Sequence, residues 1–182
     1  MKKNYYVVVD MIQGFINEGP ISDPHINRIT PTIIELIKNQ NKEDVLFVID
    51  SHEENAIEFQ AFPPHCLKGS FQSQIIEDLK PYVNHVVYKN STNAFHCIET
   101  TTYQPYDNIV LVGCCSDICI LHYALCLKTY FNQMNLDKQV IVIEDATATF
   151  TAPHHHAVEF HEMAMTLMRQ AGISVLESTD LS

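Results

Sequence analysis

Short apolar runs recur along the chain and alternate with stretches of helical periodicity. The runs are nearly continuous and rich in Val and Ile, as is typical of strands that are buried on both faces of a sheet. A weaker run follows Gly172, which is expected to cap the end of the helix before it. The predicted strands are residues 5–9, 45–49, 86–88, 109–112 and 140–143, with 173–176 as the weaker sixth.

The segments between these runs have the spacing of amphipathic helices. In the first of them, Ile29, Ile33 and Ile37 recur on one face. The alternation of strands and helices predicts an α/β fold, a three-layer α/β/α sandwich in which helices cover both faces of a mostly parallel sheet. A length of 182 residues suits one domain, residues 1–182. The predicted helices are residues 27–39, 71–79, 117–131 and 155–171.

Reactive residues stand where the predicted strands end. Ligands of such sheets bind beyond the carboxyl ends of the strands, so these residues are expected to meet at one edge. The chain has only five glycines, none grouped as a phosphate loop requires, which excludes a nucleotide-phosphate cradle. The strand-end residues are Asp10, Asp50, Lys89, the Gly113-Cys114-Cys115 turn and Asp145.

Charge and composition narrow the functional classes. Asp and Glu total 22 against 11 Lys and Arg, a formal net charge of −11. Such an acidic surface repels phosphate backbones and anionic lipids, so neither nucleic acid nor a membrane is an expected partner. No apolar run approaches the roughly 20 residues of a membrane span. The first residues are interpreted as a strand rather than a signal peptide, and the six cysteines as reduced thiols, which together predict a cytoplasmic protein.

Cys119 lies where a helix is expected to begin, with Ser116 or Asp117 as its N-cap. The free amides and positive dipole end of a helix start favour a thiolate, the nucleophilic form of cysteine. A lone free cysteine is more often a small buried hydrophobe. Here, however, Asp10 could accept the thiol proton and Lys89 could stabilise the anion, both from the same sheet edge. The three residues together predict a cysteine nucleophile.

A second group of residues has the chemistry of a metal site. Asp50 and His52, two apart at a strand end, point the same way and could bind one cation. The following loop could return Glu58 and His65 to complete the shell. Imidazole and carboxylate ligands suit zinc, and also iron or manganese. The alternative is a polar loop with solvated histidines, and the pattern leaves both interpretations open.

The remaining histidines have no pattern that indicates a ligand set. His154, His155 and His156 would face different directions on a helix, so they cannot all bind one ion. They are interpreted as a solvated helix start after Pro153. The others are expected to be structural or exposed: His25, His85, His96, His122 and His161.

In their order along the chain, four segments resemble the isochorismatase-like cysteine hydrolases, and among these the nicotinamidases. Residues 7–11 (VVVDM) with Phe15 resemble the opening strand and its catalytic aspartate. The DSH at 50–52, followed by FPPH at 62–65, resembles the nicotinamidase metal loop, and YK at 88–89 with NAF at 93–95 resembles the lysine segment. The most specific match is GCCSDIC at 113–119, against the usual G-x-x-[ST]-D-x-C.

The resemblance implies a fold and a catalytic centre. Members have a parallel sheet, commonly of six strands, between helical layers. Their triad corresponds to Asp10, Lys89 and Cys119. The resemblance also implies a cis peptide between Cys114 and Cys115, and an oxyanion hole formed by the backbone amides of Cys115 and Cys119.

It also implies a metal and a ring pocket. In nicotinamidases a metal holds the pyridine nitrogen, and Phe15 and Phe62 match the aromatic walls of the pocket. Thr92 stands where some nicotinamidases have tyrosine, so the pocket is expected to be wider or more polar. The implied metal ligands are Asp50, His52 and His65, with Glu58 at a position that some members use as a fourth.

The function predicted from these features is that of a zinc-dependent cysteine amidohydrolase that converts nicotinamide to nicotinate and ammonia through a thioester, a reaction that serves NAD salvage. Its expected partner is the small amide, and homo-oligomerisation is left open. One alternative is a related hydrolase of another small amide, such as an N-carbamoyl compound or ureidoacrylate. An isochorismatase proper, which often lacks the cysteine, is disfavoured by Cys119, and a non-catalytic binding protein has no need of the three catalytic residues.

Overall fold

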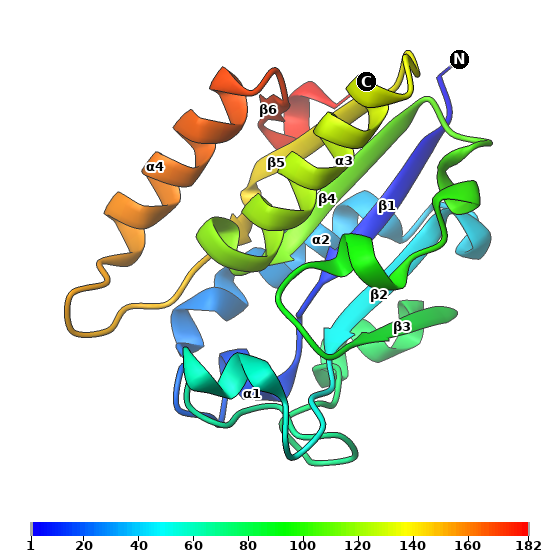
Figure 1. Ribbon diagram of the computed structural model, residues 1–182. Coiled ribbons are helices and arrows are strands. Elements are labelled where there is room, and N and C mark those ends of the chain that lie inside the picture. Colours follow the sequence, from blue (N-terminus) through cyan, green and yellow to red (C-terminus); the bar gives the residue numbers. More distant parts are fainter. Residues whose placement is uncertain (1, 182) are drawn as a thin grey trace.

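The computed structural model describes residues 2–181 and contains a six-stranded sheet in the order β3-β2-β1-β4-β5-β6 (Figure 1). All five neighbouring pairs are parallel, which confirms the predicted sheet. The strands are β1 (Asn4–Val9), β2 (Val45–Asp50), β3 (His85–Lys89), β4 (Asn108–Cys114), β5 (Gln139–Ala148) and β6 (Ser174–Leu176).

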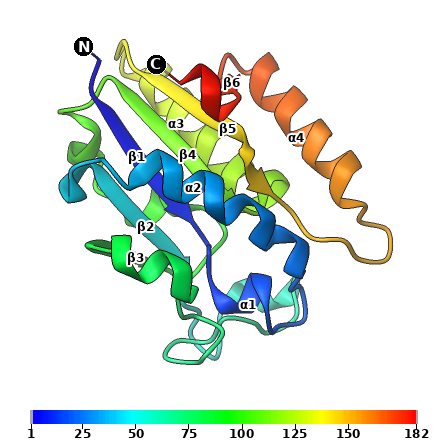
Figure 2. The same ribbon diagram turned by 180° about the vertical axis from the view of Figure 1, so that it is seen from behind.

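Helices cover both faces of the sheet, and each face has its own apolar core (Figures 1 and 2). Along β1, Val8 packs with the core that includes α1 and α2, whereas Val7 packs with the core that includes α3 and α4. Successive side chains of a strand point to opposite faces, so a strand between two cores must be apolar at every position. The helices are α1 (Gln13–Ile16), α2 (Thr30–Ile37), α3 (Leu121–Gln133) and α4 (Ala157–Gln170).

The structure departs from the prediction most clearly at residues 71–79, which do not form a helix. Only a 3-10 turn, Glu77–Tyr82, occurs near there. The backbone of the segment pairs with α1 instead: the Gly14 and Gln13 amides donate to the Gln72 and Gln74 carbonyls at 2.8 and 2.9 Å. The predicted helix at 27–39 likewise starts as a 3-10 turn, Pro24–Ile29, before α2. Gly172 follows α4 with φ of +80°, as expected of a C-cap.

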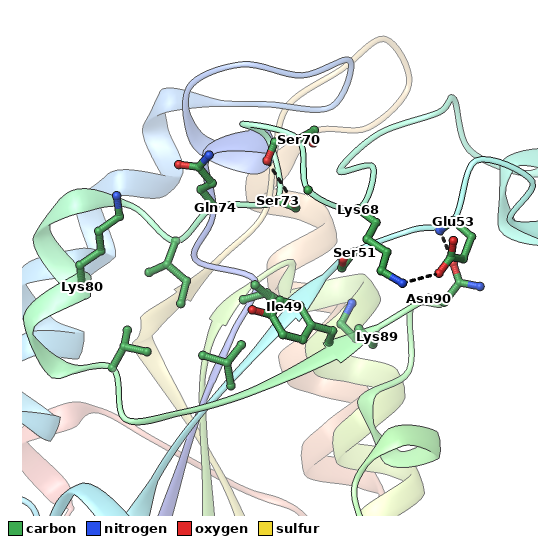
Figure 3. Close-up of a pocket in the computed structure, with 15 residues that line it drawn as sticks. Ile49, Ser51, Glu53, Lys68, Ser70, Ser73, Gln74, Lys80, Lys89 and Asn90 are labelled. Carbon is green, nitrogen blue, oxygen red and sulfur yellow. Dashed lines mark hydrogen bonds and ion pairs between the residues drawn. The ribbon is translucent and has the colours of Figure 1, made fainter.

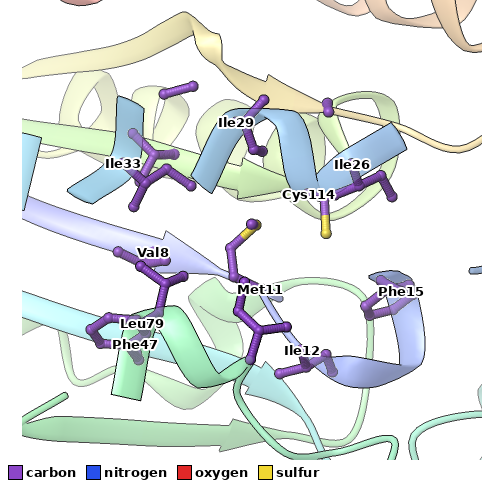
Figure 4. Packing of buried hydrophobic residues seen from close by; sticks show 14 of the residues in the cluster. Val8, Met11, Ile12, Phe15, Ile26, Ile29, Ile33, Phe47, Leu79 and Cys114 are labelled. Atoms are coloured by element: carbon purple, nitrogen blue, oxygen red, sulfur yellow. The ribbon is translucent and has the colours of Figure 1, made fainter. Parts of the chain in front are cut away.

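The strand order reverses between β1 and β4, and this places a crevice at their carboxyl ends. β4 approaches β1 closely at Gly113, where a Cβ would lie 2.0 Å from the Val9 carbonyl oxygen. The chain after β1 is fixed by packing, because Met11 and Phe15 join Cys114 and Ile26 in one core cluster (Figure 4). The crevice is therefore bordered by rigid elements. No helix in residues 2–181 combines the length and the apolar character that crossing a bilayer demands.

Candidate active site

The ends of four neighbouring strands bring Asp10, Asp50, Lys89 and Cys119 together. Asp50 and Lys89 are register partners on β2 and β3, and Asp10 immediately follows β1. Cys119 comes from the turn after β4. All four are buried, with at most 4% of any of them exposed. Charged groups in such a place need partners of opposite charge, because isolated buried charges are costly, and here one ammonium serves two carboxylates.

The Lys89 ammonium lies at the centre of this group. Its Nζ is 2.9 Å from Asp10 Oδ2, also pairs with Asp50 Oδ1, and lies 3.7 Å from Cys119 Sγ. The second Asp10 oxygen, Oδ1, accepts the Asp50 amide at 2.8 Å. Ligand atoms of Asp10, Asp50 and Cys119 all lie within 4.8 Å of one another. A carboxylate and an ammonium thus flank the Cys119 sulfur.

Burial dominates the electrostatics of this group. It raises the pKa of Asp10 to about 6, with the Asp50 charge adding to the rise and Lys89 opposing it. It also raises the pKa of the Cys119 thiol, which Lys89 only partly offsets. Asp50 is equally buried, yet Lys89 holds its pKa below the ordinary value. A helix start was expected to lower the pKa of the Cys119 thiol, whereas burial raises it. The pKa of about 6 at Asp10 suits a group that accepts and returns a proton near neutrality.

Cys119 lies in a wide helical turn, Ser116–Ile120, that precedes α3. The peptide between Cys114 and Cys115 is cis, as the resemblance implied. Cys115 occupies the N-cap position and no side chain caps the turn, so the prediction of Ser116 or Asp117 as the cap is wrong. The Cys115 carbonyl accepts the amides of Ile118 and Ile120 at 3.2 and 3.0 Å. These bonds close the turn around Cys119.

A candidate metal centre adjoins the group. Ligand atoms of Asp50, His52 and His65 lie within 4.8 Å of one another. Within the described residues 2–181, both ring nitrogens of His52 are buried without a hydrogen-bond partner, and Nε2 lies 3.4 Å from Asp50 Oδ1. Such nitrogens are costly unless another group satisfies one of them. His65 Nδ1 lies 2.8 Å from the Pro63 carbonyl, which turns Nε2 toward Asp50. The donors present therefore fit a divalent cation.

Glu58 does not belong to this set of three. Its carboxylate accepts two hydrogen bonds from Thr92, from the amide at 2.7 Å and from the hydroxyl at 2.6 Å. The two residues are 34 positions apart, and no pattern in the sequence indicated that they would meet. Their contact joins the loop after β2 to the loop after β3.

A narrow cleft opens onto Cys119, with a volume of about 10 Å³. Phe15 and Phe62 line it, as the resemblance implied, and Asp50, His65 and Cys119 provide its polar groups. This volume holds about one water molecule, so the walls must move apart to admit even a small substrate. Sequence reasoning missed two further lining residues, Ile21 and Ile118, which have no distinguishing spacing.

A larger surface depression of about 970 Å³ lies beside β3 (Figure 3). Its rim carries an ion pair between Lys68 and Glu53, 2.9 Å apart. Of the four central residues only Lys89 borders it. The reactive thiol therefore belongs to the smaller cavity.

Two histidines that were expected to be solvated, exposed or merely structural contact the nucleophile turn. His155 Nε2 lies 2.7 Å from Asp117 Oδ2, and His161 Nδ1 lies 3.1 Å from Ser116 Oγ. Asp145 was expected at the active edge, but β5 continues beyond it to Ala148, so it does not lie at the strand end. It is exposed and accepts two hydrogen bonds from Ser178. All six cysteines are free.

Comparison with known proteins gives consistent matches. A family described as "Isochorismatase domain" matches residues 5–180. Nicotinamidase 1 of Arabidopsis thaliana is 28% identical over 177 residues, covering 83% of this chain and 71% of the relative. The structure of N-carbamoylsarcosine amidase from Thermoplasma acidophilum superposes with a TM-score of 0.79 at 25% identity and 99% coverage of both chains. That of nicotinamidase PncA from Bacillus subtilis gives 0.77 at 26% identity, covering 96% of this chain and 99% of the other.

Proposed function

This chain belongs to the isochorismatase family and is a hydrolase of amide C–N bonds, and from that premise we propose that it converts nicotinamide to nicotinate and ammonia with Cys119 as the nucleophile. One observation carries the proposal: the Cys119 sulfur lies 3.7 Å from an ammonium that is itself 2.9 Å from Asp10. A purely structural cysteine has no need of either group. Phe15 and Phe62 line the cleft beside the sulfur, and two aromatic side chains suit the faces of a flat ring once the cleft widens.

In the first half of the reaction, Asp10 takes the Cys119 proton and the thiolate attacks the carboxamide carbon. Lys89 stabilises the thiolate and holds Asp10 in place through their ion pair. The carbonyl oxygen becomes an oxyanion, which the amides of Cys115 and Cys119 stabilise by about 3 kcal/mol per donor. The intermediate collapses, the C–N bond breaks, and Asp10 returns its proton to the departing ammonia. A thioester on Cys119 remains.

In the second half, water cleaves the thioester. Asp10, again unprotonated, accepts a proton from the water as it attacks the acyl carbon. The oxyanion forms in the same hole, and the C–S bond then breaks. The carboxylic acid leaves and Cys119 recovers a proton through Asp10. A pKa of about 6 lets Asp10 act as base and acid in turn.

The donors of Asp50, His52 and His65 fit a divalent cation, and we propose zinc, with iron or manganese as alternatives. When bound, the ion supplies a Lewis-acidic point that holds and orients a ring nitrogen of the substrate. Asp50 also pairs with Lys89, so it links the metal set to the catalytic group. Glu58, held by Thr92, supports the pocket wall in this arrangement.

A second candidate substrate is another small amide, such as an N-carbamoyl compound. The structural likeness to N-carbamoylsarcosine amidase favours it, and so does the polar Thr92 in the cavity. The two candidates differ in their need for a ring nitrogen to meet the metal. An N-carbamoyl substrate would be hydrolysed without dependence on the Asp50, His52 and His65 set.

The decisive experiment measures ammonia release from nicotinamide and from N-carbamoyl compounds, before and after chelation and metal restoration. We expect nicotinamide turnover that chelation abolishes and metal restores. Cys119→Ala should lower turnover at least about a thousandfold, whereas the control Cys126→Ala should not. Turnover by Cys119→Ala would overturn the nucleophile, and turnover of N-carbamoyl compounds alone would overturn the substrate. If Cys119 reacts with iodoacetamide no faster than the other thiols and no amide is hydrolysed, a non-catalytic binding protein is the better interpretation.

We further propose that the enzyme works in the cytoplasm, in NAD salvage. The six free cysteines support a reducing compartment, and two of them, Cys114 and Cys115, lie directly before the turn that carries Cys119. Sedimentation of the purified protein would establish whether it is a homo-oligomer.

A further inference from the structure

The His155 ring contacts a hydrogen-bond acceptor at each of its nitrogens. Nδ1 lies 2.8 Å from the Phe150 carbonyl oxygen, and Nε2 lies 2.7 Å from Asp117 Oδ2. A carbonyl oxygen can only accept, and so can an ionised carboxylate. The ring therefore bridges its own loop and the turn that carries Cys119.

The His155 ring is packed on both faces. It is stacked between Phe150, at 4.3 Å between centroids and 9° between planes, and Phe160, at 4.0 Å and 30°. Stacking on both sides fixes the plane of the ring. The other oxygen of Asp117, Oδ1, is buried and has no hydrogen-bond partner in residues 2–181, so His155 is the side chain that this carboxylate contacts.

A second histidine also contacts this turn: His161 from α4 lies 3.1 Å from Ser116 Oγ through its Nδ1. Asp117 is the charged residue that pairs with His155.

His155 joins both walls of the cavity. Through Asp117 it holds the turn Ser116–Ile120, which carries Cys119 and the lining residue Ile118. Its own loop is tied to the other wall, because the Thr151 amide donates to Asp23 Oδ2 at 3.0 Å and the Asp23 amide donates to the Phe15 carbonyl at 2.9 Å. A loose loop would release the turn and the Phe15 wall together.

We propose that His155 is a positioning residue that holds the turn Ser116–Ile120 through Asp117, so that Cys119 faces Lys89 and Asp10. This rests on the proposed role of Cys119. Without the His155 ring, the turn loses its tie to the loop after β5 and to the Phe15 wall, and the Cys119 sulfur is no longer held in line with the two charged groups.

The first test compares His155→Phe with His156→Phe, the same change at the exposed neighbouring residue. Phenylalanine keeps a flat ring in the stack and removes both hydrogen bonds. We expect kcat to fall about tenfold or more with KM changed less than threefold, because small misplacements of reacting groups are costly. His156→Phe should stay within twofold. A His155→Phe enzyme that is folded by circular dichroism and keeps kcat within threefold overturns the proposal.

The second test needs no substrate. The rate at which iodoacetamide alkylates Cys119 depends on how the turn holds the sulfur. We expect His155→Phe and Asp117→Ala, which remove the same contact from its two sides, to change this rate by more than about threefold, and His156→Phe to leave it within about twofold. Asp117→Ala keeps the test decisive if His155→Phe does not fold, and an unchanged rate in a folded variant overturns the proposal. Failure of wild-type protein to hydrolyse nicotinamide would overturn the proposed substrate and leave this measurement decisive.

Discussion

Replacing Lys89 with Met removes the positive charge at the centre of the site and keeps most of the side-chain volume. Lys89 is 98% buried, and its ammonium faces two carboxylates that are buried just as deeply. Without it, Asp10 and Asp50 remain as two like charges in contact. We predict a severe loss of stability as well as of activity.

The magnitude follows from the geometry. At 2.9 Å and an effective dielectric constant of about 20, one ion pair is worth about 6 kcal/mol of attraction. The cost of desolvating the ammonium opposes this, so the net loss is smaller. Breaking one partner out of a buried ion pair typically costs about 3–5 kcal/mol. We expect a loss in that range for Lys89→Met in the metal-free protein.

Lys68→Met is the matched control. Its ion pair with Glu53 has the same N–O distance of 2.9 Å, but the two side chains are 68% and 54% exposed. An exposed pair contributes less than about 1 kcal/mol. Because the N–O distance is the same in both pairs, the difference in stability loss between the two variants measures the effect of burial.

The assay is equilibrium unfolding in urea with a chelator present. The Lys89→Met deficit should shrink as the pH falls from 8 to 5. Burial already raises the pKa of Asp10 from 3.8 to about 6 in the wild type, and loss of the ammonium raises it further. A group with a raised folded-state pKa stabilises the fold below its unfolded pKa, and this stabilisation is lost as the pH rises through the folded pKa. A Lys89→Met deficit below about 1 kcal/mol at pH 8, equal to that of the control, would refute the reasoning.

Three further predictions concern the scaffold around the site. Gly113 has a φ of +115°, and the Cβ of Gly113→Ala would lie 2.0 Å from a backbone oxygen of β1, so this variant should lower the free energy of unfolding by about 3 kcal/mol or more. Gly69→Ala has open space around its Cβ and should lose only about 1–2 kcal/mol, from its positive φ alone. Urea unfolding of both variants checks this. Thr92→Val keeps the hydrogen bond from the backbone amide to Glu58 but loses the hydrogen bond from the hydroxyl, at 2.6 Å. Its melting temperature should therefore fall by an amount equivalent to about 1.5–3 kcal/mol. An unchanged melting temperature would show that the hydroxyl contact is not formed. Burial lowers the pKa of His161. The stability that this histidine contributes is therefore present above its ordinary unfolded pKa of 6.5 and is lost as the pH falls below that value. His161→Gln should make the free energy of unfolding less dependent on pH in that range, and an identical slope would contradict the assignment.

The sequence alone determined the sheet and the edge at which chemistry occurs. Buried strands such as β1 and β4 need apolar side chains on both faces, and this requirement is written locally as continuous Val and Ile runs. The carboxyl ends of parallel strands share one edge, so Asp10 and Lys89 could be placed near Cys119 without coordinates. Segment 71–79 was mispredicted because its partner is α1, far away along the chain, and its backbone bonds there outweigh its helical spacing.

Only the tertiary structure decided how the charged side chains are paired and which protonation states follow. The sequence predicted Asp50 as a metal ligand, but in the fold Asp50 also pairs with Lys89. Glu58, predicted as a possible fourth ligand, instead accepts hydrogen bonds from Thr92. A helix start predicted an acidified thiol at Cys119, whereas complete burial raises its pKa. His155 looked like one of three solvated histidines until the fold placed Asp117 beside it. Hydrophobic patterning is a property of neighbours along the chain, but hydrogen-bond partners and desolvation depend on groups that folding brings together from distant positions.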